Sequence, residues 1–423
     1  MKISRIEKCR FCKSKKLVKV INLGYQYLQG YFSNNSMRDS NQHSQKKFLT
    51  ELVRCNSEED KNACGLLQLS ISIPTRILYK KYFYRSGINS TMIEHLRKIS
   101  LSIKKIFKNK KKVNILDIGC NDGTFLKFFS KKFKKYGVDP SDSFPKKGIK
   151  NINYTNDFFP SPKLKKNIKK NKFDVITSIA MFYDLENPSL FVKNIYENLS
   201  QDGIFIFEVS YMPEMLKLNS FDTICHEHLE YYSLSVIQKI FSNNNMKVAK
   251  VEFNKSNGGS IRCFVVKKQN DKFGTNKDIN LIKKTLKNES LQGLNTKKPY
   301  LNFKKKVQKL KSKLRKTIFD LKKRGKVIHV YGASTKGNTI LQYCKLNSKV
   351  IDFAADRNPE KSGLKTLGSN LNIISEEDSR NMKPDYYLAL PWHFKKEFIR
   401  REKKFLKNGG KFIFPLPKVQ ILK

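Results

Sequence analysis

Acidic residues are scarce in this chain of 423 residues: 36 aspartates and glutamates stand against 85 lysines and arginines, which leaves a formal net charge of +49. A charge of this size suits a nucleic-acid or anionic-surface partner. The excess is mostly lysine and is spread from end to end, whereas a nucleic-acid groove would concentrate arginine and aromatic residues. We therefore interpret the charge as a composition bias of the surface, one that also suits a phosphate-bearing substrate, and expect no nucleic-acid partner.

Long apolar runs are also missing. No run approaches the roughly 20 residues that a membrane-spanning helix needs, and residues 1–9 hold no apolar stretch long enough for a secretory signal. The sequence therefore predicts a cytoplasmic protein without a membrane partner.

Cysteines are too few for a disulfide framework, since only eight occur in the whole chain. Four of them lie in the first 64 residues as Cys9-x2-Cys12 and Cys55-x8-Cys64. Four thiolates can close a tetrahedral site around a structural Zn²⁺ and leave no open position for chemistry. The long spacing before Cys64 makes Cys55 the weakest of the four predicted ligands, and the alternative is a set of ordinary buried thiols.

The length predicts two or three domains. Residues 1–75 form a turn-rich module, 76–268 an α/β domain, 269–325 a helical connector and 326–423 a second α/β domain. In the first α/β domain, short β-branched runs predict strands at 113–118, 135–138, 174–178, 204–209 and 261–266, with helices at 190–199 and 234–243. In the second, strands are predicted at 327–331, 350–355, 386–390 and 411–415, and helical spacing marks 303–321 in the connector.

A glycine-containing turn follows the first of these strands. It reads Asp117-x-Gly119-x-Asn121-x-Gly123 and precedes a helix that begins near Thr124. Glycines let the backbone turn tightly and approach a ligand, and the helix start offers free N–H groups. A dinucleotide site would carry a glycine where Asn121 stands. The acidic flanks suit the cationic sulfonium of S-adenosylmethionine better than a diphosphate.

Two further elements complete this cofactor prediction. Asp139 ends the second strand, where a carboxylate can accept both ribose hydroxyls. Asp157 and Phe158 then place an acid and an aromatic ring where adenine could be bonded and stacked. The three elements together predict a class I Rossmann-like methyltransferase domain that binds S-adenosylmethionine.

The C-terminal domain repeats part of this pattern. Residues 331–338 end a strand and open a helix, and Asp356 closes the next strand. This is a phosphate-friendly turn with an acid at the distance of a nucleoside site. A second cofactor and a purely architectural domain remain open alternatives.

Several stretches match one known family in the same order: 9–12, 64–69, 82–87, 115–123, 221–228, 257–259 and 331–338. Through them the chain resembles, over nearly its full length, the three-domain C-methyltransferases that act on nucleotide-linked keto-sugars. The resemblance implies a zinc-binding module, a methyltransferase domain and a C-terminal Rossmann-like domain that meets the nucleotide end of the substrate. By the match, Ser334, Lys336 and Asn338 are expected at that substrate. We expect a monomer.

The resemblance also assigns roles to the cluster at residues 225–228. It implies that His228 removes a proton next to a ketone, so that the enolate attacks the methyl group of the cofactor. Histidine suits this role because its pKa lies near working pH. Glu227 would orient the base or the substrate. Where some members carry a tyrosine, this chain has Cys225, and a thiol is a poor donor. The resemblance implies that this position faces the sugar, so Cys225 is also expected at the substrate.

Tyr84 matches a family tyrosine that could donate to the enolate oxygen, with Tyr82 as the alternative. His226 is a further catalytic candidate, although it could simply pack in a core. A metal site at the two histidines lacks further ligands. Two other functions stay open: an O- or N-methyltransferase for another metabolite, and a zinc-containing nucleic-acid methyltransferase.

Overall fold

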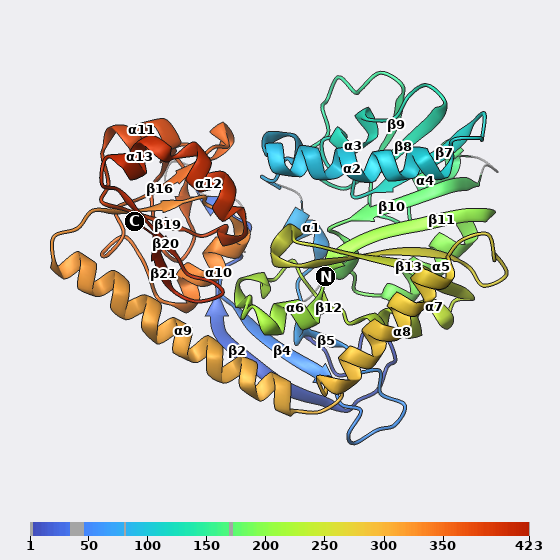
Figure 1. The fold of residues 1–423 in the computed structure, drawn as a ribbon, viewed down its shortest axis with the longest axis horizontal. Coiled ribbons are helices and arrows are strands. Elements are labelled where there is room, and N and C mark those ends of the chain that lie inside the picture. The colour runs from blue at the N-terminus through green and yellow to red at the C-terminus, as the bar shows by residue number, and fades with distance from the viewer. Residues whose placement is uncertain (1–2, 34–45, 80–81, 169–171, 423) are drawn as a thin grey trace.

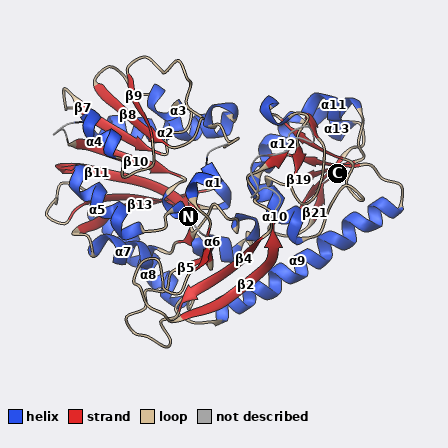
Figure 2. Cartoon of the chain, turned by 180° about the vertical axis from the view of Figure 1, so that it is seen from behind, coloured by secondary structure: helices blue, strands red, loops and turns tan. Residues whose placement is uncertain are grey.

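The protein consists of two α/β domains that stand on an antiparallel sheet and a long helix (Figure 1). The structure is a computed structural model and describes residues 3–33, 46–79, 82–168 and 172–422. Figure 2 shows the same arrangement from behind, with the helices of each α/β domain packed on the two faces of its sheet.

The middle domain is built on a seven-stranded sheet in the order β13-β14-β11-β10-β7-β8-β9. Its strands are β7 (Val113–Ile118), β8 (Phe133–Asp139), β9 (Ile152–Asn156), β10 (Phe173–Ile179), β11 (Leu199–Ser210), β13 (Met246–Asn254) and β14 (Ser260–Lys267). The strands from β7 to β11 pair in parallel, and β14 runs antiparallel to both of its neighbours. Because β8 and β10 flank β7 on opposite sides, a ligand crevice is expected at the carboxyl end of β7. The predicted α/β class is confirmed.

Alternating side chains divide the core of this domain into two halves. In β11, Ile204 and Ile206 pack on one side with α2 and α3, whereas Phe205 and Phe207 pack on the other with α4, α5 and α7. The period of two is the signature of a strand buried on both faces. The helices are α2 (Ser90–Ile106), α3 (Thr124–Lys127), α4 (Pro162–Ile168), α5 (Pro188–Asn198), α6 (Met212–Lys217) and α7 (Leu234–Ser242).

The N-terminal module shares its sheet with the middle domain. Its strands β2 (Leu17–Gln26), β4 (Phe48–Cys55) and β5 (Leu67–Leu69) are antiparallel, and β12 (Glu230–Tyr231) pairs with β5. The small strands β1 (Ser4–Arg5) and β6 (Ile71–Ser72) pair with each other, and helix α1 (Thr75–Tyr79) follows. The module thus completes its sheet with a strand that lies directly after residues 225–228.

Two helices lead to the C-terminal domain: α8 (Asn276–Leu291) and α9 (Lys298–Lys323). A capping box between Thr275 and Asp278 starts α8, and α9 has a proline in its first turn. Figure 1 shows α9 running beneath β2 toward the C-terminal domain. No helix in the described part of the chain combines the length and the apolar composition that crossing a membrane requires.

The C-terminal domain has a six-stranded sheet in the order β18-β16-β15-β19-β20-β21, parallel except for the last pair. Its strands are β15 (Ile328–Tyr331), β16 (Phe353–Asp356), β18 (Ile373–Ser375), β19 (Tyr386–Ala389), β20 (Lys411–Phe414) and β21 (Gln420–Leu422). Its helices are α10 (Thr335–Tyr343), α11 (Glu376–Asn381), α12 (Lys395–Arg401) and α13 (Lys403–Lys407). Strand β3 (Phe32–Ser33) of the N-terminal module pairs with β17 (Lys365–Thr366), which ties the two ends of the chain together.

Candidate active site

A cavity of about 590 Å³ lies where the three parts of the chain meet. The carboxyl ends of β7 and β8 form one side of it, the carboxyl ends of β15 and β16 form another, and α1 with the segment after it lies between them. Parallel strands of two sheets therefore point their carboxyl ends into one space, and such ends are where open α/β sheets bind ligands.

The side formed by the middle domain contains most of the predicted cofactor residues. Gly119, Asn121, Asp139, Asp157 and Phe158 all line the cavity. The oxygens of Asp139 accept the backbone N–H of Asn121 at 2.9 Å and that of Ser141 at 2.8 Å. The Ser141 hydroxyl donates to the same carboxylate. A carboxylate has about four acceptor positions, so Asp139 keeps one acceptor position for a ribose hydroxyl. The site therefore fits a nucleoside cofactor.

Two of the predicted cofactor residues shape the turn without lining the cavity. Asp117 is buried and accepts a hydrogen bond from Thr177 Oγ1 at 2.7 Å, and burial raises the pKa of Asp117 to about 7. Gly123 has a φ of +73°, and a Cβ there would lie 2.7 Å from Ile149 Cδ1. Both residues act locally: one holds the end of β7, and the other allows the chain to enter α3.

His228 lines the same cavity, and its hydrogen bonds fix its tautomer. Its Nδ1–H donates to the backbone carbonyl of Thr223 at 2.8 Å. The proton of the neutral ring is thereby held at Nδ1, and Nε2 is left as the unprotonated acceptor. Burial, together with the ammonium of Lys336, lowers the pKa of His228 to about 3. The ring is thus neutral and able to accept a proton at neutral pH.

The other three residues of the 225–228 cluster have different surroundings. Glu227 lines the cavity, is buried, and has one carboxylate oxygen without a hydrogen-bond partner; burial raises its pKa. Cys225 is fully buried outside the cavity lining, so the thiol does not face a substrate there.

His226 points the other way. Its Nε2 lies 3.1 Å from Thr50 Oγ1, its ring packs edge-on against Phe48, and burial lowers its pKa to about 4. It is absent from the cavity lining. The alternative raised from the sequence, a packed core histidine, matches this geometry better than a catalytic role.

Two tyrosines of the segment after α1 line the cavity, and they differ in what their hydroxyls meet. Tyr84 is 43% exposed, and a hydrogen bond links its side chain to Ser86. Burial raises the pKa of Tyr82 well above the usual range, and the negative charges of Asp184 and Glu227 raise it further. Of these two tyrosines, Tyr82, the alternative named from the sequence, is the one on which the carboxylates of Asp184 and Glu227 act.

The structure adds residues that the sequence did not single out. Asp184 lines the cavity after β10, has a buried oxygen without a hydrogen-bond partner, and burial raises its pKa well above the ordinary value. The ring of Tyr183 lies 4.4 Å from that of His228. Thr223 provides the carbonyl that fixes the His228 tautomer. Only their positions at the ends of β10 and η3 (Phe221–Thr223) could have indicated them.

The predicted substrate residues of the C-terminal domain divide into two groups. Ser334 and Lys336 line the cavity, with Ser334 also capping α10 by accepting the N–H of Gly337 at 3.1 Å. Asn338 is fully buried and donates to the backbone carbonyl of Gln29 at 2.7 Å. Asn338 therefore joins the C-terminal domain to the N-terminal module. Additional cationic side chains on the same wall belong to Arg357, Lys361 and Arg401.

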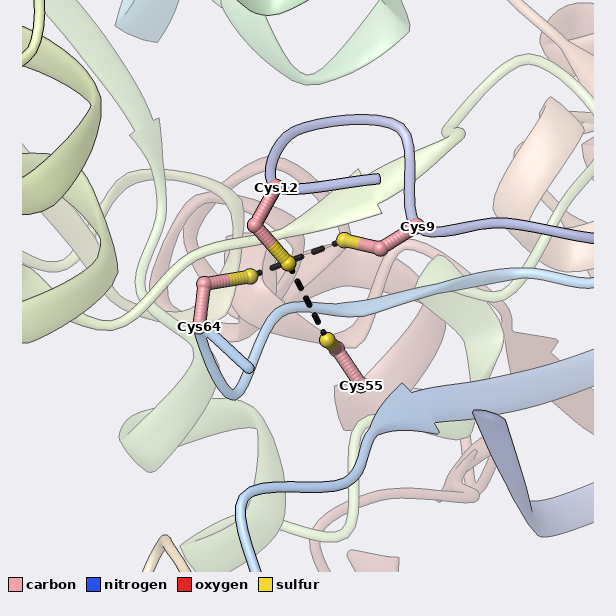
Figure 3. A group of neighbouring side chains, drawn as sticks. All are labelled: Cys9, Cys12, Cys55 and Cys64. Carbon is pink, nitrogen blue, oxygen red and sulfur yellow. Dashed lines mark hydrogen bonds between the residues drawn. The ribbon is translucent and has the colours of Figure 1, made fainter. Parts of the chain in front are cut away.

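The four predicted zinc ligands converge in the N-terminal module (Figure 3). Their sulfur atoms all lie within 4.8 Å of one another, with Cys9 and Cys64 at 3.5 Å and Cys12 and Cys55 at 3.4 Å. Zinc–sulfur bonds of about 2.3 Å in a tetrahedron place sulfurs roughly 3.8 Å apart. The four thiols therefore fit one zinc ion, and the long spacing after Cys55 is a loop that still returns Cys64 to the site.

Three family profiles match the chain in succession. A domain described as a proposed zinc binding domain matches residues 9–79, a methyltransferase domain matches 91–251, and a C-methyltransferase C-terminal domain matches 255–417. These matches follow the order of the three sheets.

The chain is also similar to individual proteins. The C-methyltransferase NovU of Streptomyces niveus is 28% identical over 426 residues, which cover 99% of this chain and 97% of the relative. The malonyl-[acyl-carrier protein] O-methyltransferase of Bacillus cereus is 26% identical over 155 residues, 36% of this chain and 58% of that protein. Among solved structures, an S-adenosylmethionine-dependent methyltransferase from Clostridium acetobutylicum covers 43% of this chain and 92% of its own, at 14% identity and a TM-score of 0.33.

Proposed function

Because the chain belongs to the three-domain S-adenosylmethionine-dependent C-methyltransferases, we propose that it methylates a carbon next to the ketone of a nucleotide-linked keto-sugar. The substrate class and the mechanism are the proposal; the cofactor and the zinc-binding module come with the family. The observation that carries the proposal is the fixed tautomer of His228 in the shared cavity.

The cavity has one side for the cofactor and another for the nucleotide end of the acceptor. The cofactor side has Asp139 as the proposed ribose ligand, and the other side has the start of α10 and the cations Arg357 and Lys361. A nucleoside diphosphate is anionic and suits that second side. A sugar attached to it would then reach the catalytic cluster between the two sides.

The chemistry follows from a neutral base beside an acidic C–H bond. His228 Nε2 takes the proton from the carbon next to the ketone, and the C–H electron pair forms a double bond while the carbonyl pair moves to oxygen. Tyr82 donates a hydrogen bond to that oxygen. When bound, S-adenosylmethionine supplies the electrophilic methyl group that this carbon accepts. Glu227, next to the base, orients the substrate.

Proton exchange separates this function from other methyl transfers. Purified protein is incubated in D₂O with a panel of nucleotide-linked keto-sugars and S-adenosylhomocysteine, and deuterium at the carbon next to the ketone is followed by NMR. Labelled S-adenosylmethionine then reports transfer of the methyl group to carbon. O- and N-methylation require no such exchange.

The matched variants are His228→Asn and His329→Gln. His329 is buried in β15 outside the cavity lining, so its variant keeps both activities. We expect His228→Asn to lose exchange and transfer by at least roughly 100-fold while still binding the cofactor. Transfer of label to oxygen or nitrogen, or full exchange in His228→Asn, would overturn the proposal.

A further inference from the structure

Helix α10 of the C-terminal domain is docked directly on the segment that bears the catalytic base. Thr339 Oγ1 donates to the carbonyl of Ile224 at 3.3 Å, and the rings of Phe221 and Tyr343 lie 5.3 Å apart in an edge-on contact. Asn338 adds its hydrogen bond to the N-terminal module. Helix α10 is therefore held in place against residues 221–224.

The first turn of α10 carries Lys336 into the cavity. Its ammonium donates to the backbone carbonyl of Asn257 at 3.3 Å, the one hydrogen bond found for this group among the described residues. An ammonium has three donors, so two remain for a ligand. The first turn of a helix also adds positive potential.

The charged groups around Lys336 locate it at the catalytic cluster. The negative charge that acts on it most is the buried carboxylate of Asp222, which accepts a hydrogen bond from the indole N–H of Trp392 at 3.0 Å. Burial and then the same ammonium lower the pKa of His228 and that of His393, and burial lowers the pKa of Lys336 itself. A cation thus stands within electrostatic reach of the base and is only partly neutralised.

We propose that Lys336 is a catalytic residue of the C-terminal domain, whose ammonium faces the oxygen of the enolate formed when His228 takes the proton. This inference rests on the proposed function. The negative charge that develops on that oxygen is stabilised by a pre-positioned cation, and the charge returns to the carbon as the new C–C bond forms and the carbonyl is restored. Lys336 also keeps His228 unprotonated, since a cation disfavours a second positive charge.

A diphosphate contact is the competing role for Lys336, and kinetics separates the two. The deuterium-exchange assay is run at saturating acceptor with the wild type, Lys336→Met, Lys336→Arg and the surface control Lys349→Met, whose side chain is exposed. We expect exchange to fall roughly 100-fold or more in Lys336→Met with little change in acceptor affinity. Lys336→Arg restores part of the rate, and Lys349→Met retains all of it.

The pH profile of exchange provides a readout that a structural role would not move. Burial is the larger cause of the lowered pKa of His228 and stays in Lys336→Met, while the smaller contribution of the ammonium is lost. The pKa of His228 therefore rises above about 3, and the acid limb in Lys336→Met shifts to higher pH. Cofactor binding by each variant confirms that it is folded. Wild-type exchange together with equal exchange in Lys336→Met, or a defect confined to acceptor affinity, overturns the inference. Absence of exchange in the wild type instead contradicts the proposed function itself.

Discussion

The two tyrosines after α1 give a sharp test of the catalytic geometry. The perturbation is Tyr82→Phe, with Tyr84→Phe as the matched variant, since each removes one hydroxyl from the same segment. Tyr82 meets the acidic cluster of Asp184 and Glu227, whereas Tyr84 is 43% exposed and linked to Ser86. Among the described residues, no hydrogen bond is found for the hydroxyl of Tyr82.

The expected magnitude follows from the value of one hydrogen bond to a developing charge. Such a bond contributes about 1.5–3 kcal/mol, which corresponds to roughly a 10- to 100-fold change in rate. Tyr82→Phe should lower exchange and methyl transfer by that factor at saturating substrates. Tyr84→Phe should change them less than about threefold, because the Tyr84 hydroxyl is hydrogen-bonded to Ser86 and not to the acids of the cavity.

The assay is deuterium exchange at the carbon next to the ketone, followed by transfer of labelled methyl, with cofactor affinity measured in parallel. Exchange isolates enolate formation from the later bond-forming step. If Tyr84→Phe shows the larger loss in exchange, the placement of the donor is wrong. If neither variant loses exchange, enolate stabilisation does not depend on a phenol of this segment.

Two further predictions concern stability. Removal of zinc with a strong chelator, or Cys12→Ser, should lower the melting temperature and methyl transfer together. A structural zinc contributes about 10–16 kcal/mol to the folding of its domain, and β5 of that module pairs with β12 after His228. Full activity in a zinc-free protein would refute this. Burial lowers the pKa of His329 from 6.5 to about 4, so its contribution to stability is complete above pH 6.5 and is lost as the pH falls toward 4. Urea unfolding measures the difference in free energy of unfolding between the wild type and His329→Gln. This difference should shrink by about 2 kcal/mol between pH 7.5 and pH 5. If it does not change with pH, His329 is not buried as a neutral ring.

Features encoded by local sequence were predictable. The turn at Gly119 and the carboxylate of Asp139 follow from a strand, a glycine and a helix start in succession, and the structure places both in the cavity. The cysteine pairs likewise predicted a zinc site whose atoms converge. Each of these patterns lies within a few residues of the sequence, so it can be recognised without knowledge of how distant segments pack.

Edge strands were missed for a physical reason. β9 (Ile152–Asn156) has a single buried residue and carries asparagine at two of its five positions, so it has little apolar periodicity. β13 (Met246–Asn254) has a shift in register between Val248 and Lys250, which breaks the period of two. The predicted strand at 350–355 begins only at Phe353, since the preceding residues form a turn.

The roles within residues 225–228 depended on long-range packing. Nothing local distinguishes His226 from His228, yet Thr50 of β4 turns the first away from the cavity and Thr223 fixes the second toward it. Asp184 was missed because a single acid after a strand is common in sequence, and it becomes notable only through its burial and its position beside Tyr183. Side-chain direction is set by these contacts, which the order of residues does not contain.

The segment that contains His228, the proposed base, is held by all three parts of the chain. The strand β12 pairs with β5 of the zinc module, the N–H of Leu229 donates to the carbonyl of Tyr183 at 3.0 Å, and Thr339 of α10 holds Ile224. A base must be placed to within a fraction of an ångström of the proton that it removes. Under the proposed function, the nucleotide end of the acceptor binds at the C-terminal domain, beside the helix that holds residues 221–224. Its binding would then contribute to the position of His228 itself.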